Sequence, residues 1–290
     1  MIAEYQDLHR YKIIYRERNP IRLVPPLEQP NLLAAEPMES AIRFFRKSQS
    51  IMHDFQVRCY RAVATSAVRE SENRELFRDR VFKESAIRLE VIDSAEEARL
   101  MYIAVKNKVD LLGHNWHLFD IGGGSIQISL INAQKLVWTV SKPIGAVRLW
   151  EKFKETPQCH PALIAYIHKE LTQMDIPVDT SEDHFRGCFA TGGSVEEATR
   201  LVNQTFQQGF TDVLSIAHLR ATRELLASLT IEQRIEQLGM AADRADIMLP
   251  AIILVEEFCS LFHFPSLVIP YTSLREGILW EIADRYYSRS

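Results

Sequence analysis

Hydrophobic and polar positions switch between strand-like and helix-like spacing along the first hundred residues. Tyr11–Tyr15 is apolar and β-branched, and the turn signal Asn19-Pro20 separates it from a second apolar run at Ile21–Val24. Apolar positions recur at helical spacing across Pro37–Phe55, and Cys59–Thr65 has the composition of a short buried strand. These patterns predict two strands, a helix and a further strand, in that order.

The alternation of strand-like and helix-like patterns continues to residue 105. Ser71–Glu84 is charged with interspersed apolar residues, which predicts a half-exposed helix, and Ile87–Ile92 returns to strand-like composition. Ser94–Val105 has an amphipathic helical pattern, and the spacing of Ser94 and Glu97 matches a capping box that would start this helix. The first part of the chain therefore has the alternation of an α/β domain.

A polar break that contains glycine, Asp110–Asn115, predicts a hinge before the second half of the chain. The segments Trp116–Ile131 and Lys135–Gly145 then predict a β meander with a glycine turn. From Val195 onward almost every segment has helical periodicity, apart from the apolar run Ser266–Pro270, which predicts a final strand. The chain therefore reads as a mixed α/β protein whose C-terminal third is mainly helical.

Length, composition and charge narrow the class of protein. The chain has 290 residues, 47% of them hydrophobic and 25% charged, which is typical of a globular protein large enough for two cores. Its net charge of −4 provides no general positive field for nucleic acid or an anionic membrane, so a polyanion would need a local site. The start of the chain lacks the pattern of a signal peptide. We expect a cytoplasmic protein with neither nucleic acid nor a membrane as its partner.

The four cysteines do not indicate a metal site or a disulfide framework. Cys59, Cys159, Cys188 and Cys259 are scattered, without a CxxC pair or a histidine at ligand spacing. We expect them to be reduced thiols.

Two short glycine-rich segments are candidates for phosphate binding. Asp120–Ser125 (DIGGGS) follows an apolar strand, where its glycines allow a sharp turn that can aim several N–H groups at one point. Phe189–Ser194 (FATGGS) precedes a predicted helix, whose free N–H groups favour an anion. The alternative is two unrelated turns, with Ser194 acting only as a helix N-cap.

Seven strings along nearly the whole chain resemble the exopolyphosphatase and guanosine pentaphosphate phosphohydrolase (Ppx/GppA) family. Each string is modest alone, but all seven occur in the family's order. They are ATSAVRESEN (Ala64–Asn73), VIDSAEEARLMY (Val91–Tyr102), DIGGGS (Asp120–Ser125), PIGAVRLWEKF (Pro143–Phe153), ATGGS (Ala190–Ser194), RADIMLPAI (Arg244–Ile252) and SLREGIL (Ser273–Leu279).

The resemblance implies an α/β fold of two ribonuclease-H-like domains with a cleft between them, as in the actin, sugar-kinase and Hsp70-like ATPase superfamily. We expect an N-terminal domain at residues 1–113, a second domain with the glycine loops at 114–275, and a C-terminal helix at 276–290 that packs back toward the first domain. The implied partners are polyphosphate or guanosine penta- or tetraphosphate, and a second copy in a homodimer.

The implied activity is Mg²⁺-dependent hydrolysis of a terminal phosphoanhydride bond of polyphosphate or guanosine pentaphosphate (pppGpp). By the resemblance, Glu97 activates water, Asp120 helps to hold the metal, and Arg69 steadies a phosphate. Phosphoryl transfer needs mainly positioning and charge neutralisation, which such groups supply. The remaining implied phosphate-binding residues are Gly122, Gly123, Gly124, Ser125, Gly192, Gly193 and Ser194.

Each of these roles has a plainer alternative. Glu97 can be the third helical residue of the capping box, and Arg69 can be a solvated charge among neighbouring charged residues. Asp120 is harder to explain structurally, because it ends an apolar strand against a glycine loop.

Two features depart from the family's pattern. Gln127 stands where the family has a glutamate, two residues after the serine of DIGGGS, so we expect weaker metal or water activation there. The family's first strand and DIGSNS-type phosphate loop are also not found, and we expect the codons before Met1 to encode them. These departures favour a second hypothesis, a catalytically weak or inactive protein that binds polyphosphate or guanosine tetra- or pentaphosphate as a regulator.

Overall fold

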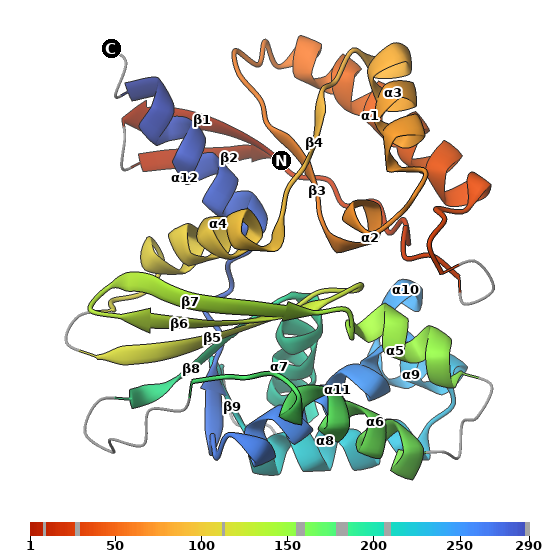
Figure 1. Ribbon diagram of the computed structural model, residues 1–290, viewed down its shortest axis with the longest axis vertical. Coiled ribbons are helices and arrows are strands. Elements are labelled where there is room, and N and C mark those ends of the chain that lie inside the picture. Colours follow the sequence, from red (N-terminus) through yellow and green to blue (C-terminus); the bar gives the residue numbers. More distant parts are fainter. Residues whose placement is uncertain are drawn as a thin grey trace. The chain divides into compact units, whose positions relative to one another are not determined.

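The computed structural model describes residues 1–7, 10–26, 30–111, 114–154, 160–177, 185–205 and 210–287. These residues form two compact units (Figure 1). The first unit is Met1–Asn107 together with Ser273–Ser290, and the second unit is Lys108–Thr272.

The second unit contains a mixed six-stranded sheet in the order β7-β6-β5-β8-β10-β9 (Figure 1). Three consecutive strands, β5, β6 and β7, form an antiparallel meander, and β8 joins the other edge of β5 in parallel. This confirms the predicted meander and the predicted final strand near residue 266. The strands are β5 (Asn115–Ile121), β6 (Ile126–Asn132), β7 (Lys135–Lys142), β8 (Phe185–Thr191), β9 (Val213–Ser215) and β10 (Ser266–Val268).

The most deeply buried helix of the second unit is α11 (Met248–Leu261), and several other helices of this unit pack against it. Its Phe258 stacks on Phe119 of β5, with ring centroids 4.0 Å apart, so the helix and the sheet share one core. The other helices of this unit are α5 (Ala146–Phe153), α6 (His160–Thr172), α7 (Gly193–Thr205), α8 (Ile216–Ser228), α9 (Ile231–Leu238) and α10 (Ala242–Ala245).

The first unit has two separate two-stranded sheets. An antiparallel hairpin joins β1 (Ile2–Asp7) to β2 (Arg10–Tyr15), and β3 (Ala62–Ala64) pairs in parallel with β4 (Leu89–Val91). The helices of this unit are α1 (Ala35–Asp54), α2 (Ser66–Arg69), α3 (Arg74–Ser85), α4 (Ser94–Lys106) and α12 (Leu274–Tyr287).

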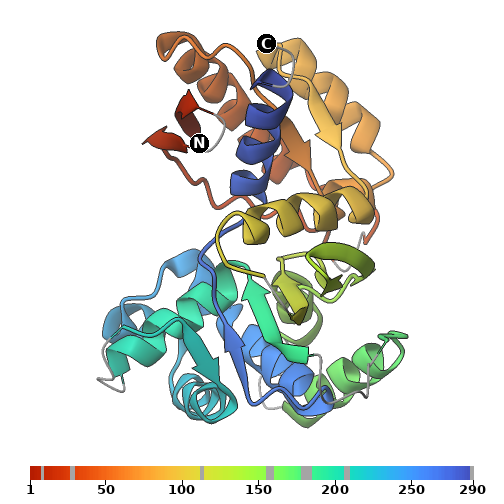
Figure 2. The same ribbon diagram turned by 90° about the vertical axis from the view of Figure 1, so that its left-hand side faces the viewer.

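Helix α12 crosses α4 at close range, as Figure 2 shows. Gly277 makes this approach possible, because a Cβ at this position would lie 1.9 Å from the carbonyl oxygen of Leu100 in α4. Ile278 of α12 packs with Ile92 and Leu100 in a small apolar cluster. The C-terminal helix therefore belongs to the core of the first unit.

Three local predictions were wrong. Ile21–Val24 does not form a strand; instead Ile21 and Leu23 pack as irregular chain against the apolar cluster of the first unit. The cap of α4 is Asp93, whose carboxylate accepts the N–H of Glu96, so Ser94 and Glu97 do not form the expected capping box. The short strand β9 lies in a segment that was predicted as helical.

No helix within the described ranges combines the length and apolar character needed to cross a membrane.

Candidate functional site

Asp120 lies near the end of β5, and a polar side chain of each neighbouring strand lies beside it. In the antiparallel pairing its cross-strand partner is Gln127 of β6, and in the parallel pairing it is Thr191 of β8. The Thr191 hydroxyl donates a hydrogen bond of 2.6 Å to Oδ1 of Asp120. Gln127 is buried, with 4% of its surface exposed. The sheet thus places one carboxyl, one amide and one hydroxyl group side by side at the ends of three strands.

Burial affects the pKa of Asp120. Loss of solvation raises the pKa of this carboxyl, and hydrogen bonds from Thr191 and from the N–H of Ile121 oppose the rise. A nearby cation or metal would favour the charged form.

The DIGGGS segment is the turn between β5 and β6, closed by a 2.9 Å hydrogen bond from the Gly122 N–H to the Ser125 carbonyl. None of the described residues accepts a backbone hydrogen bond from the N–H groups of Gly123, Gly124 or Ser125. Because these residues are at least partly exposed, their N–H groups can serve a ligand. The Gly122 N–H cannot, since the turn uses it.

N–H groups in the first turn of α5 donate hydrogen bonds to carbonyl groups of this loop and hold it in place. The N–H of Ala146 donates to the Gly122 carbonyl at 3.0 Å, and the N–H of Val147 donates to the Gly123 carbonyl at 2.9 Å. Gly145 is needed for this contact, because a Cβ there would lie 2.5 Å from backbone atoms of Gly123. The segment Pro143–Phe153, one of the seven strings that resemble the family, therefore holds the glycine loop in place.

The second glycine segment packs directly against the end of β5. Gly192 has a φ of +108°, and a Cβ at this position would lie 2.3 Å from the Ile121 carbonyl oxygen. Helix α7 starts at the next residue, Gly193, and Ser194 is buried within its first turn. The two glycine segments therefore lie next to each other, and they meet at Asp120 and Ile121.

Two arginines contact the glycine segments, and neither was predicted from the sequence as a site residue. Arg148 of α5 donates from Nε to the Gly124 carbonyl at 2.9 Å. The guanidinium of Arg244 in α10 lies against Gly193, where it would contact any added Cβ. Both residues belong to strings that carried the family resemblance, Pro143–Phe153 and Arg244–Ile252, which was the available signal.

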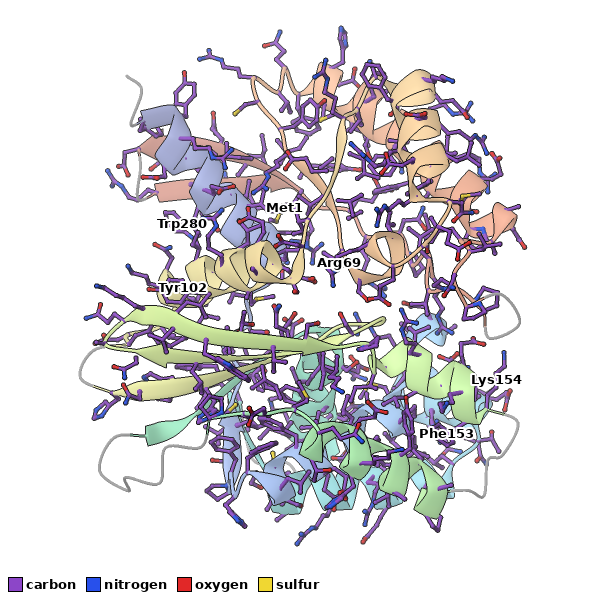
Figure 3. The ribbon with its side chains drawn as sticks, in the orientation of Figure 1. Met1, Arg69, Tyr102, Phe153, Lys154 and Trp280 are labelled. Atoms are coloured by element: carbon purple, nitrogen blue, oxygen red, sulfur yellow. The ribbon has the colours of Figure 1, made fainter. Side chains whose placement is uncertain are left out.

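The first unit brings Arg69 and Glu97 together. Arg69, on α2 (Figure 3), donates from Nη1 to Oε2 of Glu97 at 3.0 Å and to the carbonyl of Ile92 at 3.0 Å. Their side chains are only 20% and 13% exposed. Neither residue is thus a freely solvated surface charge, which was the alternative for Arg69.

The candidate residues therefore fall into two groups. Asp120, Gln127 and both glycine segments come together in the second unit, and Arg69 pairs with Glu97 in the first unit.

The second unit has the donor chemistry for Mg²⁺ bound together with phosphate. Mg²⁺ is usually held by one or two carboxylates with substrate phosphate oxygens and waters, rather than by a cage of protein ligands. Asp120 provides one such carboxylate beside the loop N–H groups, and no cluster of three metal-ligating side chains occurs among the residues that the structure describes. The residues fit a metal that arrives with its substrate.

A model of the Ppx/GppA phosphatase family matches residues 1–286 of this chain. Exopolyphosphatase 1 of Mycobacterium bovis is 27% identical over 239 residues, which cover 77% of this chain and 67% of that protein. A bifunctional 3-dehydroquinate synthase/phosphatase of Fusobacterium nucleatum is 31% identical over 148 residues, which cover 49% of this chain and only 22% of that protein.

Two solved structures share the fold over most of both chains. An exopolyphosphatase from Cytophaga hutchinsonii has a TM-score of 0.77 and 26% identity, and the match covers 88% of this chain and 84% of that one. A Ppx/GppA family member from Aquifex aeolicus has a TM-score of 0.74 and 25% identity, with 96% and 91% covered. The expected α/β fold is confirmed.

Proposed function

Because the chain belongs to the Ppx/GppA phosphatase family, we propose that it hydrolyses the terminal phosphoanhydride bond of inorganic polyphosphate, with pppGpp as a second candidate substrate. The similarity to exopolyphosphatases of known sequence and structure supports polyphosphate as the first substrate to test.

The observation that carries this proposal is the pair of glycine segments at the end of β5. The first segment has N–H groups free of backbone partners, the second opens helix α7, and Arg148 and Arg244 add positive charge beside them. Oriented N–H groups and guanidinium groups stabilise phosphate oxygens without rearrangement. This arrangement suits a chain of phosphates better than a neutral ligand.

We assign the chemical roles as follows. Glu97 takes the proton from the attacking water, Arg69 orients the Glu97 carboxylate and steadies a phosphate, and Asp120 is the protein ligand of Mg²⁺. When bound, Mg²⁺ neutralises charge on the phosphate oxygens. The Thr191 hydroxyl, at 2.6 Å, fixes the orientation of the Asp120 carboxyl.

Phosphate release from polyphosphate and from pppGpp, with and without Mg²⁺, tests this function. A mock preparation from cells that lack the chain, purified in the same way, gives the background from contaminating phosphatases. We expect Mg²⁺-dependent release from polyphosphate well above that background. Release equal to the background with both substrates would overturn the proposal.

One observation favours the second candidate, a binding protein with little or no turnover. Gln127, directly opposite Asp120, is a buried neutral amide where the resemblance led us to expect a carboxylate. If this residue limits catalysis, Gln127→Glu should raise phosphate release at least about tenfold, because the added carboxylate can hold metal or water. Titration calorimetry with polyphosphate completes the test: binding without release, in both the parent chain and Gln127→Glu, would favour the binding protein.

A further inference from the structure

Helix α5 extends the positive charge beside the glycine loop along one of its faces. Arg148 donates from Nε to the Gly124 carbonyl at 2.9 Å. Lys152 follows four residues later, so it lies on the same face of the helix, one turn or about 5.4 Å farther along. Phe153, labelled in Figure 3, marks this end of the helix. The helix thus places a second cation in line with the first.

The ring of Tyr166 in α6 lies beside both cations. The Lys152 ammonium is 4.7 Å from the centroid of this ring, and the Phe153 ring packs at 5.6 Å. Burial raises the pKa of the Tyr166 hydroxyl, Glu170 adds to the rise and Arg148 opposes it, so both charged side chains lie near this hydroxyl. The hydroxyl keeps its proton at neutral pH and can donate a hydrogen bond to an anion.

A third cation comes from the end of β7. Lys142 is paired with Glu170 at 3.5 Å. Glu170 follows Tyr166 by four residues on α6, so this ion pair borders the same ring. We define the α5 cation cluster as the three cations and the tyrosine between them: Lys142, Arg148, Lys152 and Tyr166.

The α5 cation cluster has an excess of positive charge that a ligand can reach. Its three cations outnumber the Glu170 carboxylate beside the ring, and Glu151 of α5 is itself paired with Lys154 at 2.6 Å. Lys152 is exposed, and the other members of the cluster are partly exposed. A positive surface next to an anion site suits an anion that carries several charged groups.

The surroundings of Tyr166 distinguish two candidate ligands. A nucleobase needs an open aromatic face on which to stack, but the Lys152 ammonium and the Phe153 ring already lie against this ring. A chain of phosphates needs cations and hydrogen-bond donors one after another, and Arg148, Lys152 and the hydroxyl provide them. The α5 cation cluster therefore fits a polyphosphate better than the guanosine part of a nucleotide.

We propose that the α5 cation cluster binds the inner phosphates of a polyphosphate whose terminal phosphate lies at the glycine loops. Resting on the proposed function, this site adds a preference for long chains over short ones. Pyrophosphate is too short to extend from the loop N–H groups past Arg148 to Lys152. Each phosphate of a longer chain that reaches the cluster gains charge-assisted contacts.

Titration calorimetry without Mg²⁺ tests this site with two probes, pyrophosphate and a long-chain polyphosphate of narrow length distribution. We expect Lys152→Gln to weaken binding of the long chain about three- to tenfold, because charge-assisted contacts are lost, and to change pyrophosphate binding by less than about twofold. Lys152→Arg keeps the cation and should retain the parental affinity. Lys169→Gln, at an exposed lysine of α6 outside the cluster, is the matched control and should leave both affinities unchanged.

Glu170→Gln tests the site in the opposite direction. This variant removes the carboxylate that is paired with Lys142, so we expect it to tighten binding of the long chain about two- to threefold and to leave pyrophosphate binding unchanged. Tighter binding is not expected if the ion pair only stabilises the fold. Weaker binding of the long chain by Glu170→Gln would therefore overturn the proposal.

Three other results would overturn the proposal. Unchanged binding of the long chain by Lys152→Gln would show that the chain does not reach the cluster. An equal loss for both probes would show that Lys152 does not distinguish chain length. A loss for pppGpp without a loss for polyphosphate would assign the cluster to a nucleotide.

Phosphate release with Mg²⁺ separates this site from the proposed function. Release from polyphosphate by a parent chain whose long-chain binding does not depend on Lys152 would support the function and remove the site. Long-chain binding that depends on Lys152 without any release would support the site and count against hydrolysis.

Discussion

The glycine loops of the second unit and the Arg69–Glu97 pair of the first unit are held by different interactions. In the second unit, hydrogen bonds from the first turn of α5 and direct contact between glycine and backbone atoms fix the loops. In the first unit, a guanidinium group holds Glu97, and further ion pairs connect α4 to α12 and to Arg61, the residue before β3. One unit positions backbone groups and the other positions charged side chains.

This difference matches what each group has to do in the proposed reaction. An anion site works best when its donors are fixed before the ligand arrives, and short backbone contacts provide this. A general base must be in its charged form before the reaction, and an ion pair with a guanidinium favours the charged form of a carboxylate. We therefore expect steric changes to have their main effect on the second unit, and charge changes on the first.

The largest effect should follow from removing the charge of Glu97. Glu97→Gln preserves the shape and can still accept a hydrogen bond from Arg69, but the amide cannot take a proton. We expect phosphate release from polyphosphate to fall about 10²–10⁴-fold, with an unchanged thermal unfolding curve. Glu75→Gln, at an exposed glutamate of the same unit, is the control and should keep full activity. Turnover of Glu97→Gln within twofold of the parent chain would remove Glu97 from the mechanism.

The next effect concerns the contact between Gly192 and β5. Gly192→Ala forces a left-handed residue and a Cβ into the Ile121 carbonyl, so we expect a loss of unfolding free energy of about 2–5 kcal/mol. Gly239→Ala is the matched control, because Gly239 has a φ of +62° with nothing within 4 Å of an added Cβ. The control should lose only about 1–2 kcal/mol. Urea unfolding measures both, and equal losses would show that the close approach to Ile121 does not constrain the loops.

The sequence predicted the strands and helices with clear periodicity, because a repeating apolar face has to be buried in one particular way. Helix α4, predicted at Ser94–Val105, and the β5–β7 meander are examples. Ile21–Val24 shows the limit of this reasoning. Its side chains Ile21 and Leu23 are partly buried against a cluster without any strand partner, and composition alone does not distinguish this packing from that of a strand.

The candidate site was only partly predictable for a related reason. Asp120 and both glycine segments have local signals, since glycine is needed where the chain turns or approaches another backbone. The positions of Arg148 and Arg244 depend on contacts between segments far apart in the chain. The N-cap residue of α4 was predicted wrongly for a different reason. Asp93 and Ser94 are adjacent, and both residue types cap helices, so the sequence does not distinguish them and the structure identifies Asp93.

A buried histidine should make the second unit sensitive to acid. Burial lowers the pKa of His117 from 6.5 to about 4. The unfolded chain therefore takes up a proton between these values while the folded chain does not. The contribution of His117 is fully present above pH 6.5 and is lost as the pH falls toward 4, by about 2–3 kcal/mol at pH 4.5.

The histidine variants test this by urea unfolding at pH 7 and pH 4.5. The loss of stability between the two pH values should be smaller by about 2–3 kcal/mol in His117→Gln than in the parent chain. His53→Gln, at an exposed position of α1, should show the parental loss. An acid-induced loss in His117→Gln as large as that of the parent chain would show that other groups cause the acid sensitivity.

The smallest effect concerns the ion pairs that hold α4 in the first unit. The Glu281 carboxylate of α12 is 7% exposed and accepts hydrogen bonds from Arg61 and Arg99, and Glu96 next to Glu97 binds the same two arginines. Breaking a buried ion pair costs about 3–5 kcal/mol, but Arg99 is 41% exposed and solvent screens its charge, so we expect Glu281→Gln to cost about 2 kcal/mol. Glu90 pairs with the same Arg61 but is 50% exposed, so Glu90→Gln should cost at most about 0.5 kcal/mol. Amide exchange in α4 and α12 measures both changes.

Because 1 M salt shortens the screening length to about 3 Å, high salt should reduce the difference between the two variants. A difference of the same size at low and high salt would mean that Glu281 acts through packing, and the contrast between the two units would then not rest on charge.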